Sequence, residues 1–337
     1  MSVTIYEIAE KAGVSSSTVA RVLRGDVKGT YRRSAENADR IRRIAEELGY
    51  RTNARARAFS RGRTHGIGLL YTNDAWIFEG VNTTVVNSLV RSFQDAGYHL
   101  TLTPVDDSRS WEEVVLGGQI DGCVIFQVLP EYVTEAISDL KLPLVLLGDD
   151  SDQTCSHVVV DDYAGGYLAA KHLAGLGHKK IAFYVHESVK PHCSIEQRRD
   201  GIQSAMGDAG LGEAMWLLGP EEDAVNRIIH GNVRPTGVIC YSNLESTLLM
   251  HAMWQYGVSV PNQLSLVGFN DLFATKHMTP PLTTVGFDAK KIGKLGAQIL
   301  LDTIDNEAID CKPQGKIIKP KLIVRGSTGP AVERDCQ

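Results

Sequence analysis

The sequence lacks the features that mark several large protein classes. Its 337 residues contain no run of about 18 apolar residues, the length that a membrane-spanning helix needs. The start, MSVTIYEIAEK, has no apolar signal-peptide core, so we expect a soluble, cytoplasmic protein. The six cysteines form no CxxC pair. We therefore expect reduced, mostly buried thiols and no disulfide framework.

Motifs for catalysis and cofactor binding are also missing. The chain has no GxxxxGK[ST] phosphate loop, no strand-linked GxGxxG and no GxSxG nucleophile motif. His186, His192 and Cys193 could imitate a metal site, as could Cys155 with His157, but neither set supplies four ligands at the usual spacing. These absences predict a protein that is not an enzyme and that binds neither a cofactor nor a metal.

Charge is unevenly distributed along the chain. The formal net charge is −5, and 43% of the residues are hydrophobic, enough for a substantial core. The first 63 residues carry 14 lysines and arginines against 7 acidic residues, a net +7, which leaves 21 against 33, a net −12, for the rest. A basic head of this size attracts polyanions, because each cation placed near a phosphate releases condensed counterions.

Three short helices are predicted in the basic head. Thr4 and Glu7 have the spacing of a capping box that starts the first helix, and Gly13 can adopt the left-handed conformation that ends it. Ser15 is the predicted N-cap of a second helix from Ser16, and Ser34 that of a third. The apolar positions that should form the shared core are Ile5, Ile8, Ala9, Ala12, Val19, Val22, Leu23, Ile41, Ile44, Ala45 and Leu48.

The first two helices have the spacing of a helix-turn-helix, because three or four residues including a glycine join them. In that motif the second helix enters the DNA major groove by its N-terminal turn. Ser15, Ser16, Ser17 and Thr18 would allow close approach there, and Arg21 can reach a phosphate or a guanine edge. The alternative is a basic helical hairpin that binds nothing, but the charge asymmetry favours DNA binding.

The remainder of the chain alternates apolar, β-rich runs with helical segments. Helical spacing appears between the runs, as in 81–96 and 165–176. This alternation predicts an α/β fold with parallel sheets, and the length predicts two lobes. The predicted strands are 67–71, 98–105, 122–128, 142–147, 180–185, 237–241 and 264–269.

Polar and aromatic side chains follow several of these strands. Open parallel sheets bind ligands beyond the carboxyl ends of their strands. Aromatic rings together with Asp and Asn side chains suit a sugar, whose hydroxyls need donors and acceptors and whose C–H faces stack on rings. The alternative for each residue is a solvated loop or an Asx turn. The residues concerned are Asn73, Asp74, Trp76, Phe78, Asp149, Asp150, Ser242, Asn243, Asn270 and Asp271.

The stretch TIYEIAEKAGVSSSTVARVLRG resembles the N-terminal motif of the LacI/GalR family of bacterial transcription regulators. The resemblance continues through EELGYRTNARARAF, GHKKIAF, GFNDL, PPLTTV and LIVRGSTGP, and so spans the chain. It implies a helix-turn-helix domain (1–50), a hinge segment (51–63) and an effector-binding and dimerisation domain (64–337) with two periplasmic-binding-protein-like lobes. Lobe 1 is expected at about 64–162 and 290–319, and lobe 2 at about 163–289 and 320–330, with crossings near 161–164, 288–291 and 318–322.

The resemblance also selects residues for effector binding. Arg198, three residues before Gly201, matches the arginine with which family members hold an effector. Asn243 matches an asparagine of the family, whereas Asn270 stands where most members have aspartate. Because an amide donates as well as accepts, the effector is expected to differ from a plain hexose. The predicted effector-binding set is Asp74, Trp76, Phe78, Asp149, Arg198, Asn243 and Asn270.

The hinge stretch TNARARAFSRGRT is implied to order as a helix in the minor groove of operator DNA. Asn53 could cap that helix, and Arg55 and Arg57 would meet phosphates or the groove floor. Phe59 takes the position of a leucine that wedges between base pairs in relatives, and the alternative is that it packs against the lobe. The predicted DNA-binding set is Thr4, Tyr6, Ser15, Ser16, Ser17, Thr18, Arg21, Asn53, Arg55, Arg57 and Phe59.

The leading functional hypothesis is a transcription regulator, a repressor, that binds a pseudo-palindromic operator as a homodimer under the control of a sugar or sugar derivative. The tail PAVERDCQ has no leucine heptads, which favours a dimer over a helical tetramer. The alternatives are a sugar-binding receptor without a regulatory role, a nucleobase-responsive regulator and an α/β enzyme. The sequence leaves open whether the effector acts as inducer or corepressor.

Overall fold

The computed structural model describes residues 3–23, 32–50, 63–72, 80–126, 129–150, 152, 154–189, 191–306 and 312–332. Its contacts divide the chain into two compact units, Met1–Thr64 and His65–Gln337, which we call the head and the body. Within the described segments no helix is both long and apolar enough to cross a membrane.

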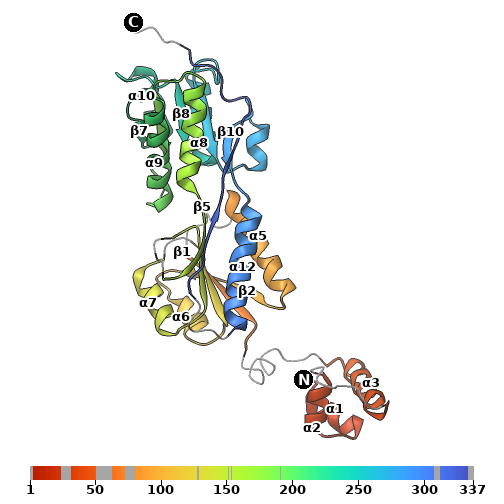
Figure 1. Cartoon of the computed structure of the whole chain (residues 1–337). Coiled ribbons are helices and arrows are strands. Elements are labelled where there is room, and N and C mark those ends of the chain that lie inside the picture. The colour runs from red at the N-terminus through yellow and green to blue at the C-terminus, as the bar shows by residue number, and fades with distance from the viewer. Residues whose placement is uncertain are drawn as a thin grey trace. The chain divides into compact units, whose positions relative to one another are not determined.

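The described part of the head forms three helices around a small apolar core (Figure 1): α1 (Ile5–Ala12), α2 (Ser16–Leu23) and α3 (Arg32–Glu47). The capping box between Thr4 and Glu7 is present, and Gly13 ends α1 in the left-handed conformation, with a φ of 64°. Ile8, Val19 and Ile41 are fully buried in the shared core. These head predictions are confirmed. The predicted Ser34 cap is wrong, because α3 begins two residues earlier, at Arg32, and so places Ser34 inside its first turn.

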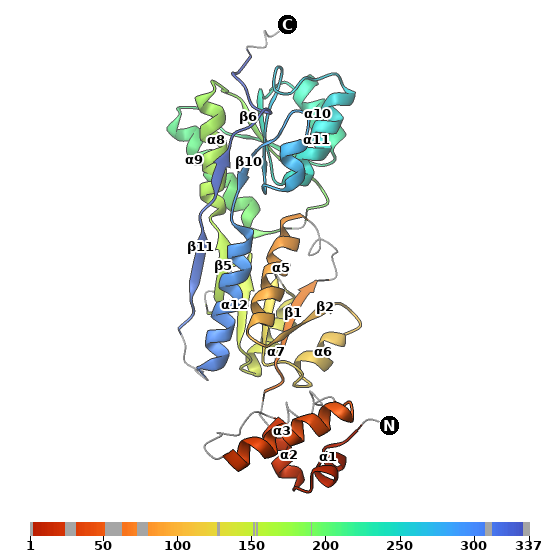
Figure 2. The same ribbon diagram turned by 90° about the vertical axis from the view of Figure 1, so that its right-hand side faces the viewer.

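Lobe 1 of the body is a six-stranded parallel sheet among the described residues, with the order β11-β5-β4-β3-β1-β2. Its strands are β1 (Gly66–Thr72), β2 (His99–Val105), β3 (Gly122–Phe126), β4 (Leu144–Leu147), β5 (Ser156–Val160) and β11 (Gly315–Ile318). Its helices are α5 (Gly80–Asp95), α6 (Ser110–Val115), α7 (Glu131–Asp139) and α12 (Ala289–Asp305). Figure 2 shows α5 and α12 side by side, far apart though they are in sequence.

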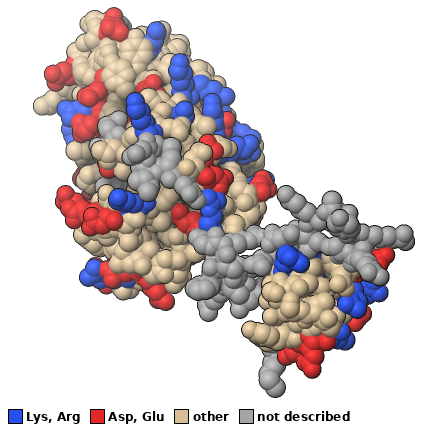
Figure 3. Space-filling model, turned by 60° about the horizontal axis from the view of Figure 1, so that its bottom comes forward, with Lys and Arg blue, Asp and Glu red and all other residues tan. Residues whose placement is uncertain are grey.

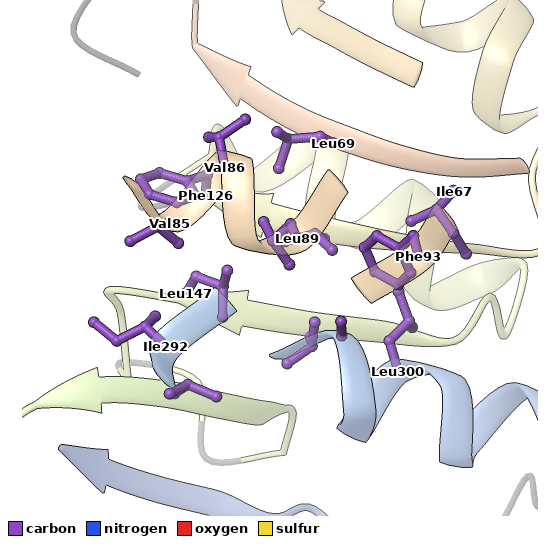
Figure 4. Close-up of a cluster of buried hydrophobic side chains, with 14 of the residues drawn as sticks. Ile67, Leu69, Val85, Val86, Leu89, Phe93, Phe126, Leu147, Ile292 and Leu300 are labelled. Atoms are coloured by element: carbon purple, nitrogen blue, oxygen red, sulfur yellow. The ribbon is translucent and has the colours of Figure 1, made fainter. Parts of the chain in front are cut away.

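Alternating strand residues of lobe 1 build two separate cores, one on each face of the sheet. Leu69 contributes to the core under α5 and α12, whereas its neighbour Leu70 contributes to the core under α6 and α7. Figure 4 shows Leu89 and Phe93 of α5 beside Leu300 of α12 in the first of these cores. Both faces are therefore covered, as a parallel sheet requires.

Lobe 2 repeats this arrangement with the strand order β12-β10-β9-β8-β6-β7. Residues of α8 and α9 pack with one face of the sheet and residues of α10 and α11 with the other. The short β12 runs antiparallel to β10, and the other pairings are parallel. The strands are β6 (Ile181–Val185), β7 (Met215–Leu218), β8 (Gly237–Cys240), β9 (Ser265–Phe269), β10 (Thr283–Gly286) and β12 (Lys321–Ile323). The helices are α8 (Asp162–Gly175), α9 (Cys193–Asp208), α10 (Glu221–His230), α11 (Asn243–Gln255) and the 3-10 helix η2 (Phe273–His277).

The chain passes between the two lobes three times: from β5 to α8, from β10 to α12 and from β11 to β12. The predicted α/β architecture with a helix-turn-helix head and two lobes is confirmed. All seven predicted strands are present, with ends that differ by a few residues. The sequence prediction missed β5, β7, β10, β11 and β12, of which each has at most five residues.

Candidate DNA-binding and effector-binding sites

A cluster of hydroxyl groups lies at the start of α2. The Ser15 Oγ accepts a hydrogen bond from the Thr18 backbone N–H at 3.3 Å and lies 2.9 Å from both the Ser17 Oγ and the Thr18 Oγ1. Ser15 therefore caps the helix, as predicted. Ser17 and Arg21 are exposed, and Ser16 is partly exposed. The first turn of α2 thus presents short polar side chains and one long cation to solvent.

The start of α1 presents a second group of predicted contact residues. Thr4 is exposed, with its hydroxyl accepting a hydrogen bond from the Glu7 backbone N–H at 3.4 Å. Tyr6 is 76% exposed, which leaves both its ring and its hydroxyl available to a partner. An exposed tyrosine can pack against a sugar–phosphate backbone and donate to a phosphate oxygen.

One arginine of the head has a structural role that sequence reasoning missed. Arg40 of α3 donates to the Ala12 carbonyl at the end of α1, at 2.7 Å, and to the Asn37 side chain at 2.9 Å. A cation at a helix C-terminus satisfies a free carbonyl and opposes the negative end of the helix dipole. The pairing joins residues 28 positions apart, so spacing within one helix gave no signal for it.

Several predicted site residues lie outside the described residues. In the hinge segment these are Asn53, Arg55, Arg57 and Phe59, and after β1 they are Asn73, Asp74, Trp76 and Phe78.

Arg198 of α9 is held rigidly by residues of lobe 2. Its Nε and Nη2 both lie 2.7 Å from the Asp162 Oδ1 at the start of α8, and its Nη1 donates to the Tyr241 carbonyl at the end of β8. The guanidinium carbon lies 4.6 Å from the centre of the Tyr241 ring and 4.1 Å from that of Phe269. The predicted effector arginine is therefore a buried, fixed group at the carboxyl ends of β8 and β9.

Glycines explain how α9 brings Arg198 so close to α8. A side-chain carbon added at Gly201 would lie 2.0 Å from the Tyr163 carbonyl oxygen, and one at Gly166 would lie 2.1 Å from the Arg198 carbonyl oxygen. Neither position can hold a larger residue while the two backbones remain this close. The glycine-lined contact of α8 and α9 thus sets the short Arg198–Asp162 distance.

Asn243 is the first residue of α11 and is partly buried. The preceding Ser242 caps the helix by accepting from the Leu244 backbone N–H at 3.0 Å, and its hydroxyl donates to the buried Glu245 carboxylate. A side-chain carbon added at Gly80, where α5 of lobe 1 begins, would lie 3.9 Å from the Asn243 Oδ1. Asn243 therefore belongs to the edge of lobe 2 that faces lobe 1.

Asp149 and Cys193 make a second contact between the lobes. Asp149 follows β4 of lobe 1 and is 5% exposed, and the Cys193 thiol at the start of α9 lies 3.9 Å from its Oδ1. Within the described ranges, donor atoms of Asp149, Asp150 and Cys193 lie within 4.8 Å of one another. Burial, reinforced by the nearby Asp149, raises the pKa of Cys193 to about 11. Structural zinc sites use four donors, one more than this group of described residues supplies.

Asn270 follows β9 and adopts a left-handed conformation with a φ of 67°. Its backbone N–H donates to the Val285 carbonyl at 2.9 Å. Asparagine tolerates this conformation better than most residues, which gives a backbone reason for its presence here. The adjacent Asp271 binds Arg325 with an Nη2–Oδ1 distance of 2.6 Å, an ion pair that the sequence prediction missed. We call Asp149, Arg198, Asn243 and Asn270 the strand-end site.

Comparisons with known proteins agree with both parts of this arrangement. Residues 4–53 match the family model described as bacterial regulatory proteins, lacI family, and residues 170–328 match a periplasmic binding protein-like domain. The HTH-type transcriptional repressor PurR of Haemophilus influenzae (strain PittEE) is 27% identical, with 96% of this chain and 98% of that protein covered. The chain joins a LacI-family helix-turn-helix domain to a periplasmic-binding-protein-like domain.

Solved structures of LacI-family regulators share the fold. The lac repressor dimer bound to operator and the anti-inducer ONPF matches with a TM-score of 0.82 at 19% identity, covering 98% of this chain and all of the repressor chain. The complex of the transcriptional regulator CelR with cellobiose matches with a TM-score of 0.70 at 22% identity, covering 96% of this chain and 99% of CelR. With its LacI-family head and its periplasmic-binding-protein-like domain, this chain is a DNA-binding transcription regulator, and the relatives named are transcription regulators as well.

Proposed function

We propose that this LacI-family chain is a repressor that binds a pseudo-palindromic operator as a homodimer and whose operator affinity is controlled by a small carbohydrate at the strand-end site. The observation that carries the proposal is the combination of an exposed cation, Arg21, on a helix-turn-helix with a buried, fixed arginine, Arg198, on a two-lobed body. The exposed Arg21 suits binding to a polyanion such as DNA, and the buried Arg198 suits binding to a small ligand.

The head is the proposed DNA-binding unit, with Thr4, Tyr6, Ser16, Ser17 and Arg21 as contact residues. The net charge of +7 over its first 63 residues supports this choice. The body face seen in Figure 3 carries both basic and acidic side chains, and residues 64–337 have a net charge of −12. Ser15 and Thr18 would act by capping α2 and so holding its first turn in shape.

The domain limits proposed are 1–50 for DNA binding, 51–63 for the hinge and 64–337 for effector binding and dimerisation. In the hinge we propose that Asn53, Arg55 and Arg57 order on operator DNA and that Phe59 wedges into a base step. Replacing Phe59 by alanine would then reduce operator bending and affinity while leaving effector binding intact. Unchanged bending in a gel phasing assay would exclude the wedge.

Homodimer formation is proposed because two-fold protein symmetry would match two operator half-sites. Large apolar side chains on lobe 2 support a partner surface: Phe273 is 75% exposed and Leu244 is 49% exposed. Phe273 follows Leu272 in the sequence, and Leu244 follows Asn243. The side chains of Leu272 and Asn243 would lie within 4 Å of a carbon added at Gly80. The lac repressor, a structural neighbour, is described as a dimer. Sedimentation of the full chain as a monomer at micromolar concentration would contradict this proposal.

For the effector, a sugar or sugar derivative is proposed. The strand-end site combines carboxylate, amide and guanidinium groups, the donors and acceptors that sugar hydroxyls require, and the partly exposed Tyr241 ring lies 4.6 Å from the Arg198 guanidinium carbon. One neighbour in fold was solved with cellobiose. The proposed ligand contacts are Asp149, Arg198, Asn243 and Asn270 from the described residues, with Asp74, Trp76 and Phe78 from the segment after β1.

The decisive experiment is a selection from random DNA duplexes with the purified full chain. We expect enrichment of a two-fold symmetric sequence and, by fluorescence anisotropy, a change in its affinity when a carbohydrate that raises the melting temperature is added. No enrichment would contradict the regulator. Enrichment without any ligand response would contradict the effector coupling, and a response to nucleobases alone would favour the nucleobase-responsive alternative. A ligand-binding protein that selects no DNA would be a receptor without a regulatory role.

A further inference from the structure

Most hydrogen-bonding capacity of Arg198 is already used within lobe 2. A guanidinium group carries five N–H donors. Two nitrogens, Nε and Nη2, lie 2.7 Å from the Asp162 Oδ1, and Nη1 donates to the Tyr241 carbonyl. Among the described residues, these bonds use three of the five N–H groups. Arg198 can therefore offer individual hydrogen bonds, but the fork that would receive a carboxylate through Nε and Nη2 is occupied by Asp162.

The charge of Arg198 is compensated where it lies. The side chains of Arg198 and Asp162 are 7% and 12% exposed, so water screens their interaction only weakly. The rings of Tyr241 and Phe269 lie 4.6 and 4.1 Å from the guanidinium carbon and further restrict the approach of solvent. A ligand entering here meets an ion pair that is neutral as a unit, with a carboxylate as one half.

The described neighbours of this pair add no second cation. Burial lowers the pKa of His192, against smaller opposing effects of Asp162 and Asp149, so its ring is neutral at neutral pH. The Cys193 thiol, with a pKa of about 11, is also neutral, and it lies 3.9 Å from the carboxylate of Asp149. Carboxylates thus outnumber cations among these described groups.

We propose that Asp162 is a specificity-determining residue, which makes the strand-end site select uncharged polyhydroxy ligands over the corresponding sugar acids and sugar phosphates. The inference rests on the proposed carbohydrate effector and narrows its chemical class. A ligand hydroxyl accepts from a remaining N–H of Arg198 and donates to a carboxylate, so it satisfies both halves of the pair. A ligand carboxylate or phosphate also accepts from the arginine, but Asp162 already compensates the charge of Arg198, so the negative ligand gains less attraction and is repelled by the Asp162 carboxylate.

The test uses neutral sugars with their matched acids: glucose with glucuronate, galactose with galacturonate, ribose with ribonate and cellobiose with cellobionate. Thermal shift identifies the responsive pair, and calorimetry measures both affinities with the wild-type full chain. We expect the neutral member to bind at least ~10-fold more tightly than its acid. An acid that binds as tightly as its neutral partner, or more tightly, overturns the inference without any variant being needed.

Substitutions of Asp162 separate charge from shape. Asp162→Asn should shift the ratio of acid to neutral affinity toward the acid by ~10-fold or more, whereas Asp162→Glu should keep the preference for the neutral sugar. Asp208→Asn is the matched control, because Asp208 is an exposed residue of α9 whose carboxylate accepts from the Tyr167 hydroxyl. Circular dichroism checks that each variant is folded. An unchanged ratio in folded Asp162→Asn overturns the role of Asp162.

Operator binding is measured in parallel so that the two proposals fail separately. Acid binding with normal, ligand-sensitive operator binding contradicts only the selectivity. No thermal shift with any sugar or acid contradicts the carbohydrate effector and the inference together, even when operator DNA is still bound.

Discussion

Arg21 in the head and Arg198 in the body are both predicted to bind a ligand, yet their surroundings are opposite. Arg21 is exposed on α2. Arg198 is 7% exposed and held by an ion pair, a backbone carbonyl and two aromatic rings. An exposed cation stays hydrated and its side chain stays mobile until it binds DNA, which releases the counterions condensed on the DNA phosphates. A buried one has already lost both during folding.

This difference predicts how each region responds to substitution. In the head, function and stability reside in different side chains, because the core residues and Arg40 hold the helices while Ser17 and Arg21 face solvent. In the body, Arg198 is proposed to serve both, since its partners Asp162 and Tyr241 are structural and its other two N–H groups have no partner among the described residues. Substitutions at the Arg198 site should therefore lower both stability and ligand affinity. Substitutions of exposed residues in the head should lower DNA affinity without lowering stability.

The largest effect is expected for Arg198→Ala. Removal of the guanidinium leaves Asp162 buried without its counter-charge, which should lower the free energy of unfolding by about 3 to 5 kcal/mol and abolish sugar binding. Urea denaturation followed by tryptophan fluorescence measures the stability. The neighbouring Arg199, 48% exposed and paired with Glu196, is the control, and Arg199→Ala should cost less than about 1 kcal/mol. Equal losses for the two arginines would contradict the distinction.

A smaller loss is expected for Gly201→Ala. The added carbon would lie 2.0 Å from the Tyr163 carbonyl oxygen, so α8 and α9 must separate, at a cost of about 1 to 3 kcal/mol. Because Arg198 lies on the same helix, sugar affinity should fall as well. Gly207 is the matched control, since a carbon added there meets nothing within 4 Å. Gly207→Ala should stabilise the protein by up to about 1 kcal/mol, because alanine favours the helix. A stable Gly201→Ala with normal affinity would show that the helices have room to adjust.

The sequence predicted those features that depend on local chemistry. The Thr4–Glu7 capping box, Gly13 and the Ser15 cap follow from short-range rules, and the seven long apolar runs predicted strands. The missed strands are short, and β11 and β12 consist mainly of exposed or partly exposed residues, so no apolar pattern distinguishes them from loops. Their strand geometry comes from pairing with β5 and β10, which are distant in sequence.

The site shows the same limit. The sequence identified Arg198 through its match to a family motif, but it did not predict that Arg198 is buried. Its partner Asp162 lies 36 residues earlier, and the two meet only because Gly166 and Gly201 allow α8 and α9 to approach. Likewise, Arg325 reaches Asp271 over 54 residues. Such pairings depend on packing between elements, which neither periodicity nor spacing within one element reveals.

In the head, Arg21→Ala should weaken operator binding by about 1 to 3 kcal/mol without changing stability. If Arg21 contacts a phosphate, the slope of log affinity against log salt should also fall by about 1. Fluorescence anisotropy over a range of salt concentrations measures both quantities. Arg227→Ala, which removes an exposed arginine of α10, should change neither. A loss of stability in Arg21→Ala would contradict the separation of function from folding in the head.

The smallest effect, and one confined to the body, should come from pH. All ten histidines lie at or after His65, so the head has none. Burial lowers the pKa of His178, whose Nδ1 lies 2.9 Å from the Thr236 hydroxyl and whose Nε2 lies 3.1 Å from the Gly329 carbonyl oxygen. Burial likewise lowers the pKa of His172 and of His192. Below the unfolded value of 6.5 the unfolded chain binds protons that the native body does not, so stability is lost as the pH falls.

Tryptophan fluorescence isolates this effect, because all four tryptophans also lie in the body. The free energy of unfolding should decrease between about pH 7.5 and about pH 5.5, while amide exchange in 3–23 and 32–50 should show no such decrease for the head. His178→Gln should reduce the change in the free energy of unfolding with pH, since glutamine cannot take up the proton. Substitution of the exposed His230 should leave this change the same. An equal pH response in head and body would place the titrating groups among the carboxylates that both regions share, rather than among the buried histidines of the body.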